Sequence, residues 1–121
     1  MKHLTKACVD PNVGVREIAL HTLGCVGMPE ATTALDVITK CLADKESQVR
    51  AMAAWCAGEI GPAAAHKTGR KVILLLKDSY WKVRTAACLA LGFLGPNISE
   101  EVYPVLTKVL RDGSVNKLTV C

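Results

Sequence analysis

Cysteine and histidine are the residue types in this chain that could ligate a metal ion or serve as a nucleophile. The 121 residues include six cysteines and three histidines, which are Cys8, Cys25, Cys41, Cys56, Cys88 and Cys121 with His3, His21 and His66. No C-x-x-C pair is present, and no cysteine stands beside a histidine at the spacing of a zinc site. No Ser/His/Asp or Cys/His set has a catalytic spacing either. We therefore expect no metal, no cofactor and no catalytic residue, and we expect reduced thiols that pack as small apolar side chains.

Aspartate and arginine recur at a constant interval, which is a second arrangement capable of chemistry. Three aspartates lie 34 residues apart and each precedes an arginine by six residues; the pairs are Asp10 with Arg16, Asp44 with Arg50, and Asp78 with Arg84. Such columns suit an ion-pair ladder, in which each Asp lies near a helix N-terminus and each Arg bridges neighbouring Asp residues, or anion binding by the Arg side chains. The constant interval favours the ladder, because a pair present in every copy belongs to the contact between copies.

Basic residues gather in the segments that precede each of these aspartates. Lys6, Lys40 and Lys108 share one repeat column, in which Leu74 is the apolar exception, and the other basic residues lie on the same segments. The candidate partner-binding set is Lys6, Lys40, Arg70, Lys71, Leu74, Lys77, Lys108 and Arg111. Apart from Glu100 and Glu101 at the start of the last segment, Asp36 is the one acid within these segments. The charge pattern suits a surface that attracts an acidic protein segment. A solvated helix face that keeps the protein soluble is the alternative.

The 34-residue interval extends to many other columns, so the chain is read as a repeat array. The shared unit is D-x4-V-R-x2-A-x4-G-x2-G. We expect a single domain over residues 1–121, divided into a half-repeat, three full repeats and a truncated repeat, at 2–9, 10–43, 44–77, 78–111 and 112–121. Agreement of so many columns at one period is the signature of repeat architectures.

Each repeat carries two helical patterns. Val49, Ala53, Cys56 and Ile60 share one face at helical spacing. This pattern and its equivalents predict first helices, called the A helices here, over 13–26, 47–60 and 81–94. Each is followed by a glycine suited to a helix C-terminus and then by a proline. A second apolar pattern predicts the B helices over 31–43, 65–77 and 99–111, with residues 2–9 as an additional B helix.

Small residues recur where the A helices would meet. Gly24, Gly58 and Gly92 fall inside the last turn of the A helices, where a glycine costs about 1 kcal/mol relative to alanine. Repetition of that cost implies a gain from close backbone approach between helices. No repeat can bury its apolar face alone, so the copies must stack. We therefore expect an all-α, right-handed α-solenoid of helical hairpins, with self-association through its uncapped ends.

Composition excludes several classes of protein. The net charge of +4 is mild and does not by itself indicate nucleic acid. No apolar run approaches the roughly 18–20 residues of a membrane span, and the N-terminus lacks the apolar region of a signal peptide. We expect a cytoplasmic protein, with the nucleus as the alternative. Tyr80 and Trp81 open the third A helix, either as exposed interface anchors or as a cover over a seam between repeats.

The segments DKESQVRAMAAWCAGEIG and DSYWKVRTAACLALGFLG resemble HEAT repeats, in particular the short kind seen in phycobilisome-lyase-type proteins. The resemblance covers nearly the whole chain. It implies that the B helices line a concave surface and that the protein is a non-catalytic scaffold, which binds a partner segment along that surface. The Trp-Leu-Gly-Tyr pattern of tetratricopeptide repeats, which share the period, is absent.

Some HEAT-like proteins are enzymes, so a lyase or hydroxylase fragment is an alternative. Deoxyhypusine hydroxylase is similar in fold and holds iron with His-Glu pairs on repeated helices. The corresponding positions here read Arg16-Glu17, Arg50-Ala51 and Arg84-Thr85, which argues against a di-iron site. Binding of an acidic ligand or nucleic acid through the basic B helices is a further alternative. Nucleic acid is disfavoured because aromatic residues for base stacking are scarce there.

Overall fold

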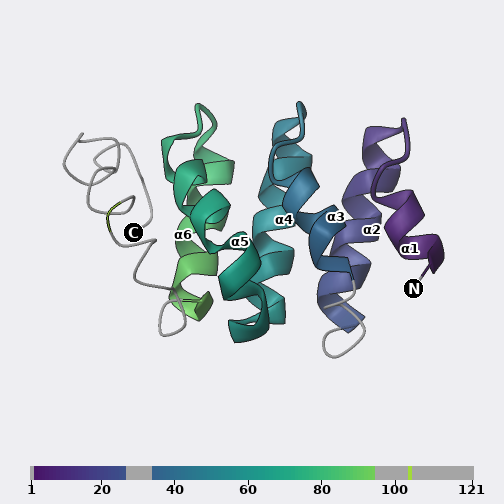
Figure 1. Cartoon of the computed structure of the whole chain (residues 1–121). Helices are drawn as coiled ribbons and strands as arrows, with labels where there is room; N and C mark the ends of the chain where they lie inside the picture. Colours follow the sequence, from purple (N-terminus) through teal and green to yellow (C-terminus); the bar gives the residue numbers. More distant parts are fainter. Residues whose placement is uncertain (1, 27–33, 95–103, 105–121) are drawn as a thin grey trace.

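The computed structural model describes residues 2–26, 34–94 and 104 (Figure 1). Helices account for most of these residues, and no strand occurs among them. The elements are α1 (Lys2–Ala7), α2 (Val13–Val26), α3 (Leu35–Cys41), α4 (Ser47–Ile60), α5 (Pro62–Leu74), the 3-10 helix η2 (Leu75–Lys77) and α6 (Trp81–Leu94).

The helices form two rows. In Figure 1, α1, α3 and α5 lie in front, and α2, α4 and α6 lie behind them. Each helix of the rear row packs against the next one, α2 on α4 and α4 on α6, while front helices pack on their rear neighbours. The rear helices are the predicted A helices, and α1, α3 and α5 with η2 are B helices. The predicted all-α solenoid of helical hairpins is confirmed.

The A helices begin and end at the predicted residues, whereas the B helices do not. α1 ends at Ala7 rather than at residue 9, and α3 ends at Cys41 rather than at residue 43. α5 begins at Pro62, three residues before the predicted start. Gly61 has φ 78° and ψ −146° and serves both as the C-cap of α4 and as the N-cap of α5. Proline suits the first helical position because it lacks only a donor that would be unpaired there. The predicted helix over 99–111 and the truncated repeat at 112–121 lie outside the described residues.

The core lies between the two rows. The predicted A-helix face is buried, since Val49, Ala53 and Cys56 are fully inaccessible and Ile60 nearly so. The largest fully buried side chains include Leu20, Leu23, Ile38, Ile73 and Leu94, which come from both rows. Burial of each such side chain contributes roughly 1.5–3 kcal/mol. Cohesion therefore comes from seams between hairpins rather than from any hairpin alone.

Candidate interaction surfaces

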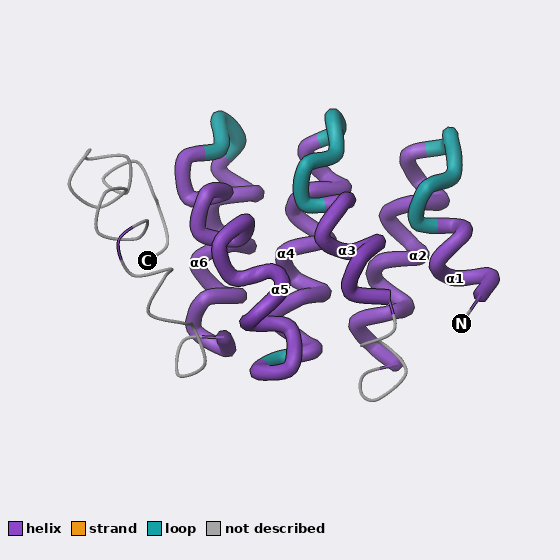
Figure 2. Tube along the Cα trace, viewed as in Figure 1, coloured by secondary structure: helices purple, strands orange, loops and turns teal. Residues whose placement is uncertain are grey.

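The three described loops that precede the A helices stack along one edge of the molecule (Figure 2). Each is closed by its aspartate, whose Oδ1 accepts a hydrogen bond from the backbone N–H two residues later. The acceptors and donors are Asp10 with Asn12 (2.9 Å), Asp44 with Glu46 (2.9 Å) and Asp78 with Tyr80 (3.0 Å). The aspartates therefore shape the turn before the helix, and they are not themselves the capping residues.

The arginines join successive loops. Arg16 donates from Nε and Nη2 to the two carboxylate oxygens of Asp44, at 3.0 and 3.2 Å. Arg50 makes the same two-pronged contact with Asp78, at 2.7 and 3.2 Å. The third donor of each arginine, Nη1, turns back to the loop of its own repeat. In Arg50, this Nη1 donates to the backbone carbonyl of Asp44 at 2.7 Å. Arg84 donates in the same way to the carbonyl of Asp78 at 2.7 Å.

The arginines of this ladder connect neighbouring repeats. The hydrogen bond from Arg50 to the Asp78 carboxylate raises the pKa of the Arg50 guanidinium. The same guanidinium lies 5.8 Å from the centre of the Tyr80 ring, in cation–π contact. The side chains of Arg16 and Arg50 are thus engaged by aspartates, so the anion-binding alternative has no support at these two positions.

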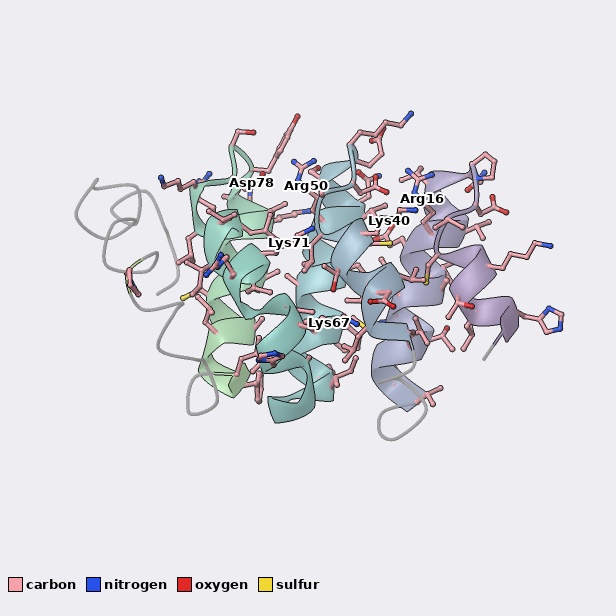
Figure 3. All side chains as sticks on the ribbon, viewed as in Figure 1. Arg16, Lys40, Arg50, Lys67, Lys71 and Asp78 are labelled. Atoms are coloured by element: carbon pink, nitrogen blue, oxygen red, sulfur yellow. The ribbon has the colours of Figure 1, made fainter. Side chains whose placement is uncertain are left out.

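The basic B-helix residues lie on the surface. Every described member of the predicted set is exposed, namely Lys6, Lys40, Arg70, Lys71, Leu74 and Lys77. In Figure 3, Lys40 and Lys71 lie on the front row, below the edge that carries Arg16, Arg50 and Asp78. Lys108 and Arg111 lie outside the described residues. The structure therefore gives one face of the solenoid a run of exposed cations.

The acid of the described B helices is neutralised by a neighbour. The Asp36 carboxylate on α3 pairs with Lys67 of α5, at 2.6 Å between Oδ1 and Nζ. Lys40 and Lys71 make no ion pair within the described part of the chain, so their charges are available to a partner. We call the surface of Lys6, Lys40, Arg70, Lys71, Leu74 and Lys77 the basic B-helix surface.

A recess lies beside Lys40. Its volume is about 360 Å³, and it is lined by Cys8, Val9, Arg16, Lys40, Cys41, Asp44 and Lys45. The Arg16–Asp44 pair forms a polar wall, whereas Lys40 and Lys45 are exposed. An acidic side chain of a partner would meet these two ammonium groups without displacing the ladder.

The A-helix side has a different chemistry. Several large apolar residues of the A helices and their loops are exposed, among them Ile18, Tyr80, Trp81, Leu89 and Phe93. Tyr80 is 56% exposed and Trp81 is 53% exposed, so both are accessible, although Tyr80 also contacts Arg50 of the preceding repeat. A hollow of about 200 Å³ opens between α4 and α6.

Sequence reasoning missed this hollow. The signal was present in the repeat columns, where Met52 and Trp55 of the second copy become Ala86 and Leu89 in the third. Loss of side-chain volume at two positions of one helix face leaves space beside the neighbouring helix.

A family model described as HEAT repeats matches residues 1–68 and again residues 35–119. Together the two matches span nearly the whole chain, and the stacked hairpins agree with them. The chain belongs to the HEAT-repeat family. The match is to HEAT repeats in general and does not resolve the narrower resemblance to phycobilisome-lyase-type proteins. Among curated proteins, none matches the chain significantly.

Over the described ranges 2–26 and 34–94, no group of three or more His, Cys, Asp or Glu side chains is placed to hold a metal ion. None of the helices found in those ranges is long and apolar enough to cross a bilayer.

The cysteines of the HEAT array differ in environment. Burial raises the pKa of the Cys8 and Cys56 thiols to about 12 and that of Cys41 to about 11. Cys25 is a free and exposed thiol. Cys88 is disulfide-bonded, so the expectation of reduced thiols is wrong for this residue. Because the thiolate is the reactive form, the three buried thiols are chemically inert in the folded protein.

We expect Cys25 to react first among the described free thiols. Treatment at neutral pH with an aromatic disulfide reagent should label Cys25 in a fast phase, while Cys8, Cys41 and Cys56 follow only as fast as the protein opens. Peptide mapping by mass spectrometry identifies the labelled residue, and Cys25→Ser should remove the fast phase. Fast labelling of Cys56 would contradict the burial described above.

The raised thiol pKa values also set a direction for alkaline stability. Below the unfolded-state pKa of about 9, the buried thiols are protonated in both states and their contribution is fully present. As the pH rises from about 9 toward 11, the unfolded chain loses these protons first, so the free energy of unfolding should fall.

Proposed function

We propose that this chain is a non-catalytic scaffold that binds an acidic segment of a partner protein along the basic B-helix surface. The observation that carries the proposal is the run of exposed cations on α1, α3, α5 and η2, beside a single Asp36 that is already paired. HEAT repeats are commonly protein-interaction scaffolds, which supports the general role. Opposite charge on a partner segment would steer its approach and fix its register.

The non-catalytic part of the proposal rests on how the ladder uses its residues. In the resemblance to HEAT-like hydroxylases, His-Glu pairs would fall where this chain has Arg16-Glu17, Arg50-Ala51 and Arg84-Thr85. Arg16 and Arg50 are committed to carboxylates of the next loop, and Arg84 donates to a loop carbonyl. A fixed guanidinium at these positions repels a cation rather than binding one.

We further propose a cytoplasmic location, with the nucleus as the alternative. Support comes from Cys8, Cys41 and Cys56, which are buried free thiols of the kind kept reduced in those compartments. The disulfide at Cys88 counts against this location, because disulfides are rare in those compartments.

Charge reversal on the B helices tests the proposal. A dye-labelled, Glu-rich peptide should bind the wild-type chain, and the Lys40→Glu, Lys71→Glu double variant should bind it at least tenfold more weakly, because attraction becomes repulsion. Fluorescence anisotropy measures the affinity, and circular dichroism should show unchanged helix content. Gln48→Glu, which adds one negative charge on the A-helix side, is the control and should change the affinity less than twofold.

Two results would count against the proposal. Equal affinity of the wild type and the double variant would show that the B-helix cations do not form the site. Tighter binding to a single-stranded oligonucleotide, with a steep dependence on salt, would favour the nucleic-acid alternative.

A further inference from the structure

The hollow between α4 and α6 is lined by A-helix residues alone. Small residues contribute to the lining at Gly58, Ala86 and Ala90, and large apolar residues contribute at Trp55, Trp81, Leu89 and Phe93. Glu59, Lys82 and Thr85 complete the lining. No residue of α1, α3 or α5 takes part, so the hollow is separate from the basic B-helix surface.

The preceding pair of A helices, α2 and α4, shows the equivalent seam with a tryptophan in the place of Leu89. Between α2 and α4, the ring of Trp55 lies directly over Gly24, where an added methyl group would collide with it. The Trp55 ring also stacks on His21, with centroids 5.0 Å apart and planes inclined by 14°. A hollow of about 550 Å³ also adjoins α2 and α4. Met52 and Trp55 line it, together with Ala51, Lys82 and the polar residues Glu17, Ser47 and Gln48.

Four substitutions between copies make the hollow between α4 and α6 more apolar than the one beside α2 and α4. Met52 and Trp55 of α4 are replaced at the equivalent positions of α6 by the smaller Ala86 and Leu89. Polar Ser47 and Glu59 are replaced by Trp81 and Phe93, which line the hollow and are more than half exposed. The third copy thus loses volume inside and gains apolar surface at the rim.

We propose that this hollow is a docking site for an amphipathic helix of a partner protein, which inserts a bulky apolar side chain between α4 and α6. The seam between α2 and α4 supports a bulky apolar occupant. In that seam, Trp55 and Met52 stand at the positions that Leu89 and Ala86 hold between α4 and α6. The proposal concerns a second surface and does not rest on binding along the B helices.

Hydrogen bonding favours a helical partner over an extended one. The walls of the hollow belong to α4 and α6, whose backbone groups are paired within the helices except in the first and last turns. An extended segment laid in this apolar groove would leave its own amides without partners, at a cost that a helix avoids. A helix can present apolar side chains at i, i+4 and i+7 to such a groove.

Charges at the two ends of the hollow set the polarity of the partner. α4 and α6 both begin at the loop edge (Figure 2), so Lys82 lies toward that edge and Glu59 lies toward the opposite end. The matching helix carries an acidic residue at the end that meets Lys82 and a basic residue at the end that meets Glu59.

The chain contains its own reporter for this binding. Its two tryptophans, Trp55 and Trp81, both line the hollow. The probe is an Ala-rich peptide of about 18 residues, long enough to form helix, with Leu, Phe and Leu at i, i+4 and i+7, Glu at one end and Lys at the other. Because the probe has no tryptophan, a saturable blue shift of the emission reports removal of water from the hollow.

Variants taken from the chain's own second copy provide the test. Ala86→Met with Leu89→Trp should close the hollow, and Phe93→Glu should place a charge on its apolar rim. Each should weaken binding of a dye-labelled probe by about fivefold or more, measured by anisotropy. Lys71→Glu on the B-helix side is the control and should change the affinity less than twofold. Thermal unfolding of each variant establishes that it is folded.

Several outcomes would overturn the proposal. One is a wild-type chain that gives no saturable signal with the probe, and another is a folded closing variant that binds as well as the wild type. Equal binding of a probe with two central prolines, which cannot form the helix, would exclude the helical occupant. Loss of binding in Lys71→Glu would place the probe on the other surface.

Discussion

Arg50→Ala is expected to lower the free energy of unfolding by about 2–3 kcal/mol, although no apolar core residue is touched. The substitution removes the two-pronged contact with Asp78 and the hydrogen bond to the Asp44 carbonyl. The side chains of Arg50 and Asp78 are only 15% and 9% exposed, so the Asp78 carboxylate would be left unpaired and poorly solvated. The loss is smaller than for a fully buried pair because water still reaches both groups.

Urea unfolding followed by circular dichroism measures this loss, and two other variants calibrate it. Lys67→Ala removes the exposed pair with Asp36 and should cost less than about 0.5 kcal/mol. Arg50→Lys keeps the charge but lacks the planar fork, so it should recover only part of the stability. A loss below that of Lys67→Ala would show that the ladder is not a stabilising contact between repeats.

The ladder also explains why so much of this fold could be predicted. Each Arg contacts the Asp 28 residues later, and that separation is fixed by the repeat period less the six residues between Asp and Arg of one copy. Once copies stack side by side, residues one period apart lie in equivalent places on neighbouring hairpins. The contact is therefore a consequence of periodicity, and the sequence alone contains it.

Helix ends were predictable only where one residue determines them. The A helices end as predicted because glycine and proline follow them. The start of α5 was not predicted correctly, because a proline can either follow the end of one helix or begin the next. The backbone conformation of Gly61 decides that Pro62 begins α5. Its φ of 78° lets the chain reverse direction within a single residue.

The hollow was harder to predict because it depends on volumes from two helices. Ala86 and Leu89 are ordinary residues in an A-helix pattern. Their effect becomes visible only when α6 is placed against Gly58 and Trp55 of α4. The exposure of Tyr80 and Trp81 follows similarly from what the neighbouring helices leave uncovered.

The two faces of the array therefore differ in what they offer a partner. The B-helix side presents mobile ammonium groups, whose attraction acts at a distance and weakens with salt. The A-helix side presents an apolar hollow between rigid helices, whose attraction requires contact and depends on shape. Substitutions on one face should leave binding at the other unchanged, because residues so far apart share no partners.

Gly58→Ala and Gly92→Ala occupy the same repeat column, yet their effects on stability should have opposite signs. At Gly58 the new methyl group would lie 3.0 Å from the Cα atom of Ala90 and 3.3 Å from its Cβ atom, so α4 and α6 must separate. Overpacking of this kind costs roughly 1–3 kcal/mol, which exceeds the gain of about 1 kcal/mol from replacing a helical glycine. We expect a net loss of about 1 kcal/mol.

At Gly92 no atom of the described structure lies within 4 Å of an added methyl group. Because no overpacking opposes the gain in helix propensity, Gly92→Ala should raise the free energy of unfolding by up to about 1 kcal/mol. Urea unfolding of the two variants under one condition measures the difference, which should be about 2 kcal/mol. Equal effects would mean that the glycine column does not report the close approach of neighbouring A helices. A loss at Gly92 as large as that at Gly58 would instead show that something packs against α6 as tightly as α6 packs against α4.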